Sequence, residues 1–199
     1  MSLAETQKLL ARLYTDFDLR RRLSVEPETV AAEYNIAESE VVALARSIST
    51  ELDEFADSLF YKRLREAEKL LPLSRKVLGK QFELLFQSFA VGFAPRSIKK
   101  HLEDAVAFAD FLASQNFGLR WIRDLVLYER TRLEFNGYGK KFAVRRFRYD
   151  VLAITEFVNN SANGFTELQT RDFSMFGTTI ILLRMPNGRA RQFVVKLSF

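Results

Sequence analysis

Few side chains in this 199-residue sequence are of the types that catalyse reactions or bind metals. Cysteine is absent, which excludes disulfides, thiolate metal ligands and cysteine nucleophiles. His101 is the single imidazole, and no second histidine stands four positions away, as a helical zinc site requires. Asp124 and Glu129 fall on a predicted helix, where we expect structural hydrogen bonds if they are buried. The residue types therefore predict a protein that is not an enzyme and holds no cofactor and no metal.

The charged residues indicate that the protein binds an anionic partner. Residues 136–199 contain ten Lys or Arg and four acids, a net charge of +6, whereas the other 135 residues carry −1. Within this segment, Arg145 to Tyr149 interleaves cations with aromatic rings, as platforms for single-stranded nucleic acid do. Alternation in any exposed strand gives the same pattern, so a solvated sheet face is the other interpretation.

The elements that must position these residues begin with a series of helices. Apolar residues recur every three or four positions through most of the first 135 residues. Asp16 can cap one helix, Pro27 can begin the next, and Asn35 can end it in the left-handed conformation. The longest helix is expected over about Glu38 to Leu70, because the proline two residues later disfavours its continuation.

Three further helices are expected before residue 136. One begins at Ser74 and ends near Gly92, the next is capped by Ser97, and the last follows Gly118 and contains Trp121. Phenylalanines at helical spacing in these segments predict a core, because amphipathic helices must bury such stripes. They are Phe82, Phe86, Phe89, Phe93, Phe108 and Phe111.

From Asn136 onward the pattern changes to that of short strands. Phe142 and Val144 alternate on one parity and Phe147 and Tyr149 on the other, which predicts a β-bulge at residues 145–146. Residues 150–158 are ambiguous and slightly favour a short helix. Phe173 and Phe176 precede a strand and could line a groove.

A hairpin is the clearest feature of the C-terminal region. Asn187-Gly188 lies between an apolar segment at residues 178–185 and an alternating one at residues 190–199, which is the strongest short-range hairpin signal. The fold class is therefore predicted to be α+β. It comprises a helical domain over residues 1–135, a joint at 136–141, and a small basic, mostly antiparallel β or α/β domain over 142–199.

The N-terminal residues indicate where the protein works. Charged residues and leucine alternate up to Tyr14, without the apolar segment and cleavage site of a secretory signal. No stretch approaches the roughly 18 apolar residues of a membrane span. We therefore expect a cytoplasmic protein that does not bind membranes.

Sequence motifs along most of the chain resemble those of one family of small helical proteins. These motifs are Leu10 to Asp16, Leu19-Arg20, Pro27-Glu28, Val30 to Tyr34, Phe55-Ala56, Ser58-Leu59, Lys62-Arg63, Glu66-Ala67, Leu70 to Leu73, His101 to Ala105 and Phe147 to Val151. The family accompanies the multinuclear-iron, peptide-modifying oxygenases of methanobactin type. Asn35 stands where the family leads us to expect glycine, a small departure since Asn tolerates the left-handed conformation.

The resemblance implies a non-catalytic accessory protein for the biosynthesis of a peptide natural product. Its expected partners are an iron oxygenase, which carries out the chemistry, and the ribosomally made precursor peptide that it helps to hold. Peptides commonly bind by adding a strand to a sheet edge. The expected peptide-binding or partner-binding residues are Arg145, Arg148, Arg184, Arg189, Arg191, Phe193 and Val195. The alternative is a nucleic-acid-binding or regulatory protein that uses the basic C-terminal region.

Overall fold

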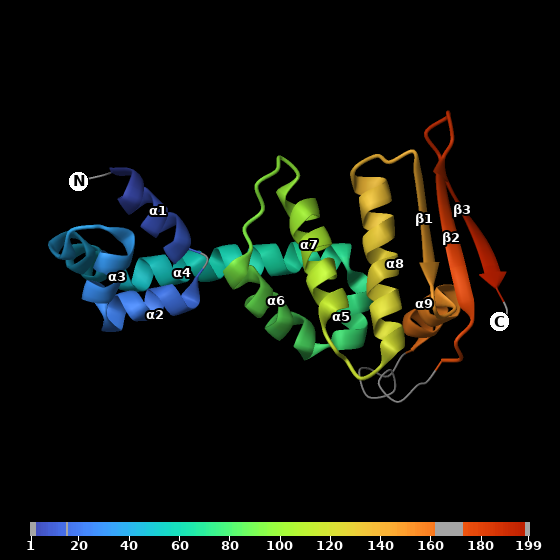
Figure 1. Cartoon of the computed structure of the whole chain (residues 1–199), viewed down its shortest axis with the longest axis horizontal. Coiled ribbons are helices and arrows are strands. Elements are labelled where there is room, and N and C mark those ends of the chain that lie inside the picture. Colours follow the sequence, from blue (N-terminus) through green and yellow to red (C-terminus); the bar gives the residue numbers. More distant parts are fainter. Residues whose placement is uncertain (1–2, 15, 162–172, 198–199) are drawn as a thin grey trace. The chain divides into compact units, whose positions relative to one another are not determined.

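The computed structural model describes residues 3–14, 16–161 and 173–197, whose contacts group into two compact units. Unit 1 comprises residues 1–64 and 87–94, and unit 2 comprises residues 65–86 and 95–199. Two helices, α4 (Glu38–Leu70) and α6 (Lys80–Gly92), contribute to both. The predicted fold class is confirmed, because helices precede a small antiparallel sheet at the C-terminal end (Figure 1).

Unit 1 begins with three short helices, α1 (Leu3–Leu13), α2 (Phe17–Val25) and α3 (Pro27–Tyr34), followed by the first part of α4. The predicted helix ends are confirmed. Asp16 Oδ1 accepts a hydrogen bond from the Leu19 N–H at 2.9 Å, and Asn35 ends α3 at φ 54° and ψ 44°. The apolar faces of these helices form one core, made of Leu9, Leu13, Leu19, Leu23, Val30, Ala31, Tyr34 and Val41.

The helices of unit 2 include one break that the sequence analysis did not predict. The single helix expected from Ser74 is two helices, α5 (Pro72–Leu78) and the start of α6. Gly79 separates them at φ 54° and ψ −127°, a conformation that a side chain would strain. The apolar spacing continues across Gly79, and therefore the periodicity alone did not reveal the break.

The start of α7 (Lys100–Ser114) also differs from the prediction. Ser97 was expected to cap this helix, but Lys99 occupies the N-cap position and makes no side-chain cap. Glu103, within the first turn, accepts hydrogen bonds from the backbone N–H groups of Arg96 and Ser97 at 2.9 and 2.6 Å. These bonds lower the pKa of Glu103, since they stabilise its charged form.

Aromatic rings fill the core between the helices of unit 2. The ring of Phe108 on α7 meets those of Phe82 and Phe86 edge to face, at centroid distances of 5.1 and 4.9 Å. All three side chains are fully buried, as is Trp121 on α8 (Arg120–Gly137). The prediction that the helical phenylalanines form core is confirmed for Phe82, Phe86, Phe89 and Phe108, whereas Phe93 and Phe111 are half-buried.

The C-terminal sheet has three strands in the order β1-β2-β3, all antiparallel. They are β1 (Phe142–Phe147), β2 (Gly177–Arg184) and β3 (Ala190–Leu197). Asn187-Gly188 closes the β2–β3 hairpin, with Gly188 at φ 78°, so this prediction is confirmed. Helix α9 (Val151–Asn160) follows β1, in agreement with the helix slightly favoured there.

The predicted bulge at residues 145–146 is wrong. The pairing of β1 with β2 is continuous from Phe142 opposite Leu183 to Phe147 opposite Thr178. Arg145 occupies an inward position, which it tolerates because its Nη1 donates a hydrogen bond to Thr131 Oγ1 at 3.4 Å. The inward side chains of β1 are therefore Ala143, Arg145 and Phe147, with no change of parity.

One face of the sheet packs on α8 and α9 (Figure 1). This inner core consists of Tyr128, Phe135, Phe147, Val151, Ile180 and Leu182. The joint expected at residues 136–141 lies inside unit 2, and the separability of residues 1–135 stays a prediction. In the described part of the chain, no helix combines the length and the apolar character that crossing a membrane requires.

Candidate binding surface

The opposite face of the sheet is apolar and open to solvent. Residues paired across the strands share a face, so the register defines this outer sheet face. It consists of Phe142, Val144 and Arg146 on β1, Thr179, Ile181 and Leu183 on β2, and Arg191, Phe193 and Val195 on β3. Phe142, Val144, Phe193 and Val195 are 57%, 50%, 46% and 44% exposed. Contiguous exposed apolar residues of this kind mark interaction surfaces.

The outer edge of β3 is unpaired among the described strands. The Arg184 N–H points to β1, where it donates to the Lys141 carbonyl, and the Met185 N–H points to the Arg189 carbonyl across the hairpin. Backbone groups alternate in direction along a strand, so those of Phe193 and Val195 face β2. The backbone groups of Gln192 and Val194 therefore face the free edge, while the side chains of Phe193 and Val195 lie on the outer sheet face.

Three of the seven residues predicted to bind a partner lie together. Arg191, Phe193 and Val195 all project from β3 onto the outer sheet face. Arg189 lies beside them in the hairpin turn, exposed, with its backbone N–H donating to Asn187 Oδ1 at 3.1 Å. These four residues form a continuous group along β3 and the turn that begins it.

The other three predicted residues lie elsewhere. The Arg184 guanidinium donates to the carbonyls of Phe135, Lys140 and Gly188 and lies 5.0 Å from the centre of the Phe135 ring, so it holds the hairpin to α8. Arg145 faces α8, and burial lowers the pKa of its guanidinium. Arg148 follows β1 and projects into a cavity beside α8.

Two buried carboxylates of α8 bind backbone N–H groups, as expected for structural hydrogen bonding. Glu129 accepts from the Leu73 N–H at 2.7 Å, the Ser74 N–H at 2.8 Å and the Ser74 hydroxyl at 2.5 Å. It thereby covers the start of α5, whose own N-cap residue, Leu71, supplies no side-chain bond. Burial raises the pKa of Glu129 to about 7 despite these three donors.

Asp124 has a similar role at the end of β1. Its Oδ2 accepts from the backbone N–H groups of Arg148 and Tyr149 at 2.6 and 3.1 Å, and burial raises its pKa. Both carboxylates are therefore occupied in joining α8 to neighbouring segments. His101 is exposed at the start of α7, and among the described residues no three His, Asp or Glu side chains gather to hold a metal ion.

The two phenylalanines before β2 have different environments. Phe173 packs edge to face against Trp121 and Phe157, at centroid distances of 5.3 and 5.6 Å, and thus belongs to the core. Phe176 is exposed. Phe173 therefore does not line a groove, and a groove beside Phe176 stays a prediction.

Comparison of the chain with protein-family models, with curated proteins and with solved structures finds no match.

Six of the nine residues of the outer sheet face were not predicted to bind a partner. Phe142 and Val144 were recognised as alternating, but the expected bulge hid that they share a face with Phe193 and Val195. Arg120 and Arg123 were also not predicted as site residues. Both lie at the start of α8, and the first turn of this helix contains no acidic residue. Two cations at a helix N-terminus oppose the helix dipole, and this was the signal that could have marked them.

Proposed function

We propose that this chain is a non-catalytic, cytoplasmic partner protein that holds an extended peptide along the free edge of β3. Following the resemblance, the peptide is the ribosomally made precursor of a multinuclear-iron oxygenase, which is the second partner. The observation that carries the proposal is that the outer edge of the eight-residue strand β3 is unpaired among the described strands, and that its exposed side chains continue an apolar sheet face. Such edges are templates for pairing with another chain.

Strand addition explains how one surface supplies both affinity and selectivity. The backbone groups of Gln192 and Val194 can bond to the peptide backbone regardless of its sequence. Alternate peptide side chains then extend the outer sheet face and contact Phe193 and Val195. The preferred peptide therefore has apolar residues at every second position over the segment that pairs.

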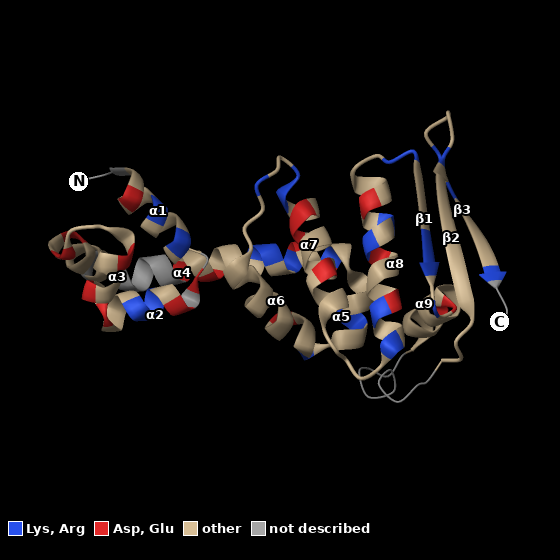
Figure 2. Ribbon diagram, viewed as in Figure 1, with Lys and Arg blue, Asp and Glu red and all other residues tan. Residues whose placement is uncertain are grey.

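The charges on the sheet favour an acidic peptide. None of the three strands contains Asp or Glu, and Figure 2 shows basic positions on them. Arg145, Arg184 and Lys196 are engaged inside the chain, Lys196 with Asp150 at 2.6 Å. Arg189 and Arg191 remain beside the edge; exposed pairs with them are worth only about 0–1 kcal/mol each, so they mainly speed association.

Phe193 is the residue whose truncation should weaken peptide binding most. Phe193→Ala is expected to raise the dissociation constant at least about tenfold, because it removes the largest side chain beside the free edge. Phe142→Ala is the matched control, since Phe142 is also exposed on the same face but lies on the opposite edge strand. Calorimetry with the proposed precursor peptide and its oxygenase measures both. Equal losses in the two variants would place the peptide across the face and not on the β3 edge.

Backbone pairing has its own test at Gln192. Gln192→Pro removes an N–H that faces the free edge, while Gln192→Ala keeps it and accounts for the lost contact of the side chain with Tyr128. We expect the proline variant to bind the peptide at least about tenfold more weakly than the alanine variant, with an unchanged circular dichroism spectrum. Equal affinity of the two would show that the edge takes no part.

A nucleic-acid ligand is the second candidate, favoured by the +6 charge of residues 136–199. Salt separates the two functions. Binding that neutralises many phosphates weakens by orders of magnitude between about 50 and 200 mM salt, whereas strand addition changes little. Tight, strongly salt-dependent binding of a single-stranded oligonucleotide, together with no binding of the peptide, would favour this candidate.

A further inference from the structure

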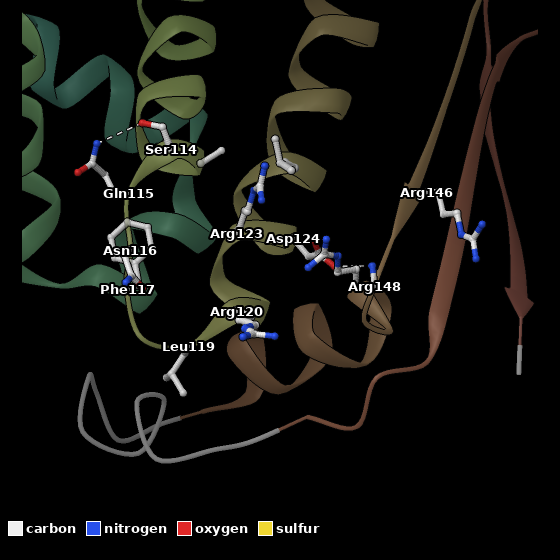
Figure 3. Close-up of a pocket in the computed structure, with 12 residues that line it drawn as sticks. Ser114, Gln115, Asn116, Phe117, Leu119, Arg120, Arg123, Asp124, Arg146 and Arg148 are labelled. Carbon is white, nitrogen blue, oxygen red and sulfur yellow. Dashed lines mark hydrogen bonds between the residues drawn. The ribbon is translucent and has the colours of Figure 1, made fainter. Parts of the chain in front are cut away.

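A cavity of about 490 Å³ opens between the end of α7 and the start of α8, and no residue of β3 lines it (Figure 3). Its size is within the range of sites for small organic ligands. The wall from α8 contributes Arg120 and Arg123, and the segment after β1 contributes Arg148. Phe117 and Leu127 add apolar surface to the same lining.

The lining is strongly basic. Arg146 lines the cavity from β1, but its side chain lies on the outer sheet face; the three other arginines and the one carboxylate of the lining, Asp124, give a net charge of +2. Figure 3 shows the side chains of Arg120, Arg123 and Arg148 in the same part of the cavity, with Arg146 farther away on β1. Within the described parts of the chain, no carboxylate forms a salt bridge with Arg120, Arg123 or Arg148. The Asp124 carboxylate attracts Arg148 and Arg123 but balances only one of the three positive charges, so a bound anion would reduce the repulsion that remains.

Two groups that would repel an anion here, the Asp124 carboxylate and the C-terminal end of α7, accept hydrogen bonds that reduce this repulsion. Asp124 Oδ2 is occupied by the N–H groups of Arg148 and Tyr149. At the end of α7, the Phe111 carbonyl accepts from the Ser114 hydroxyl and the Gln115 amide, at 2.7 and 3.3 Å. These hydrogen bonds offset the negative end of the helix dipole next to the cavity.

We infer that this cavity is a binding site for a small organic anion with two or more negative charges. Guanidinium groups bind phosphate and carboxylate oxygens in pairs, which suits either kind of anion. The cavity is larger than a bare oxyanion, so the ligand also has an uncharged part that contacts Phe117 and Leu127. This site is separate from the β3 edge and does not depend on the peptide-binding proposal.

Titration calorimetry of the full chain with two probes tests the assignment and separates the anion types. Pyrophosphate and citrate are titrated separately, in buffer free of other multivalent anions. We expect one-to-one binding of at least one probe, and the tighter probe shows whether phosphate or carboxylate is preferred. The Arg123→Gln and Arg148→Gln double variant should bind that probe at least about tenfold more weakly, since it loses two charge-assisted contacts.

A control variant of equal charge distinguishes a site from general attraction to a basic protein. Arg65→Gln combined with Lys80→Gln removes two exposed charges that do not line the cavity, and its affinity should match that of the parent within about twofold. Equal weakening in both double variants would overturn the assignment. So would the absence of one-to-one binding of either probe at millimolar concentration. Near-ultraviolet circular dichroism of Trp121, two residues from Arg123, verifies that each variant is folded.

Discussion

The free energy of unfolding of the parent protein is expected to fall by about 3 kcal/mol between about pH 4.5 and 7 because Glu129 titrates, and Glu129→Gln should abolish this fall. Burial raises the pKa of Glu129 from 4.5 to about 7 in the folded state. The folded protein therefore binds this proton more tightly than the unfolded chain does. The resulting contribution to stability is complete below pH 4.5 and is lost as the pH rises through 7. A glutamine does not titrate and cannot contribute it.

The measurement is the free energy of unfolding of both proteins at several pH values. Trp121 is the only tryptophan and is buried in unit 2, so its fluorescence reports unfolding of the unit that contains Glu129. Glutamine also changes the hydrogen bonds to Leu73 and Ser74, which shifts stability by a similar amount at every pH. The informative quantity is therefore the change with pH in the difference between the two proteins. A constant difference from pH 4.5 to 8 would show that Glu129 titrates normally.

Local signals predicted most of the helix ends correctly. Asp16, Pro27 and Asn35 each determine a helix end through their own side chain or backbone preference, and the structure places all three as expected. Glu38–Leu70 was correct at both ends for the same reason. Gly79 was missed because it breaks a helix without interrupting the apolar spacing on either side.

Non-local partners explain what could not be predicted. Ser97 has the residue type of a cap, but Glu103 takes the free N–H groups at that turn. Arg145 appeared to break the strand pattern, because nothing in the local sequence indicates that Thr131 on α8 accepts its hydrogen bond. Glu129 reaches the start of α5 from more than fifty residues away.

The candidate binding surface was predictable only where it depends on local sequence. Arg191, Phe193 and Val195 alternate on one strand, and alternation alone puts them on one face. Ile181 and Val144 extend the same face across the sheet. Their place on it depends on the order and register of the strands, which are defined only when the strands pair. The cavity beside α8 combines residues from three segments, so only the fold brings Arg120, Arg123 and Arg148 together.

Asp124→Ala is expected to destabilise unit 2 by about 2–4 kcal/mol, because it leaves two backbone N–H groups without an acceptor. The N–H groups are those of Arg148 and Tyr149, which follow β1 and lead into α9. Asp124→Asn is the matched control, since its amide oxygen can accept both bonds; we expect a loss below about 1 kcal/mol. Denaturant unfolding followed by Trp121 fluorescence measures both variants.

Hydrogen exchange tests whether the loss arises at this connection. In Asp124→Ala, the amides of Arg148 and Tyr149 should exchange faster than in Asp124→Asn, beyond the change that lower global stability alone produces. The start of α9 should be affected less, because Asp150 caps it independently by accepting from the N–H groups of Leu152 and Ala153, both at 3.2 Å. If alanine and asparagine cost the same, the negative charge of Asp124 and not its acceptor oxygen stabilises the end of β1. In that case Asp124 stabilises the fold by attracting the nearby arginines. Its main role beside the cavity would then not be to accept the hydrogen bonds of Arg148 and Tyr149.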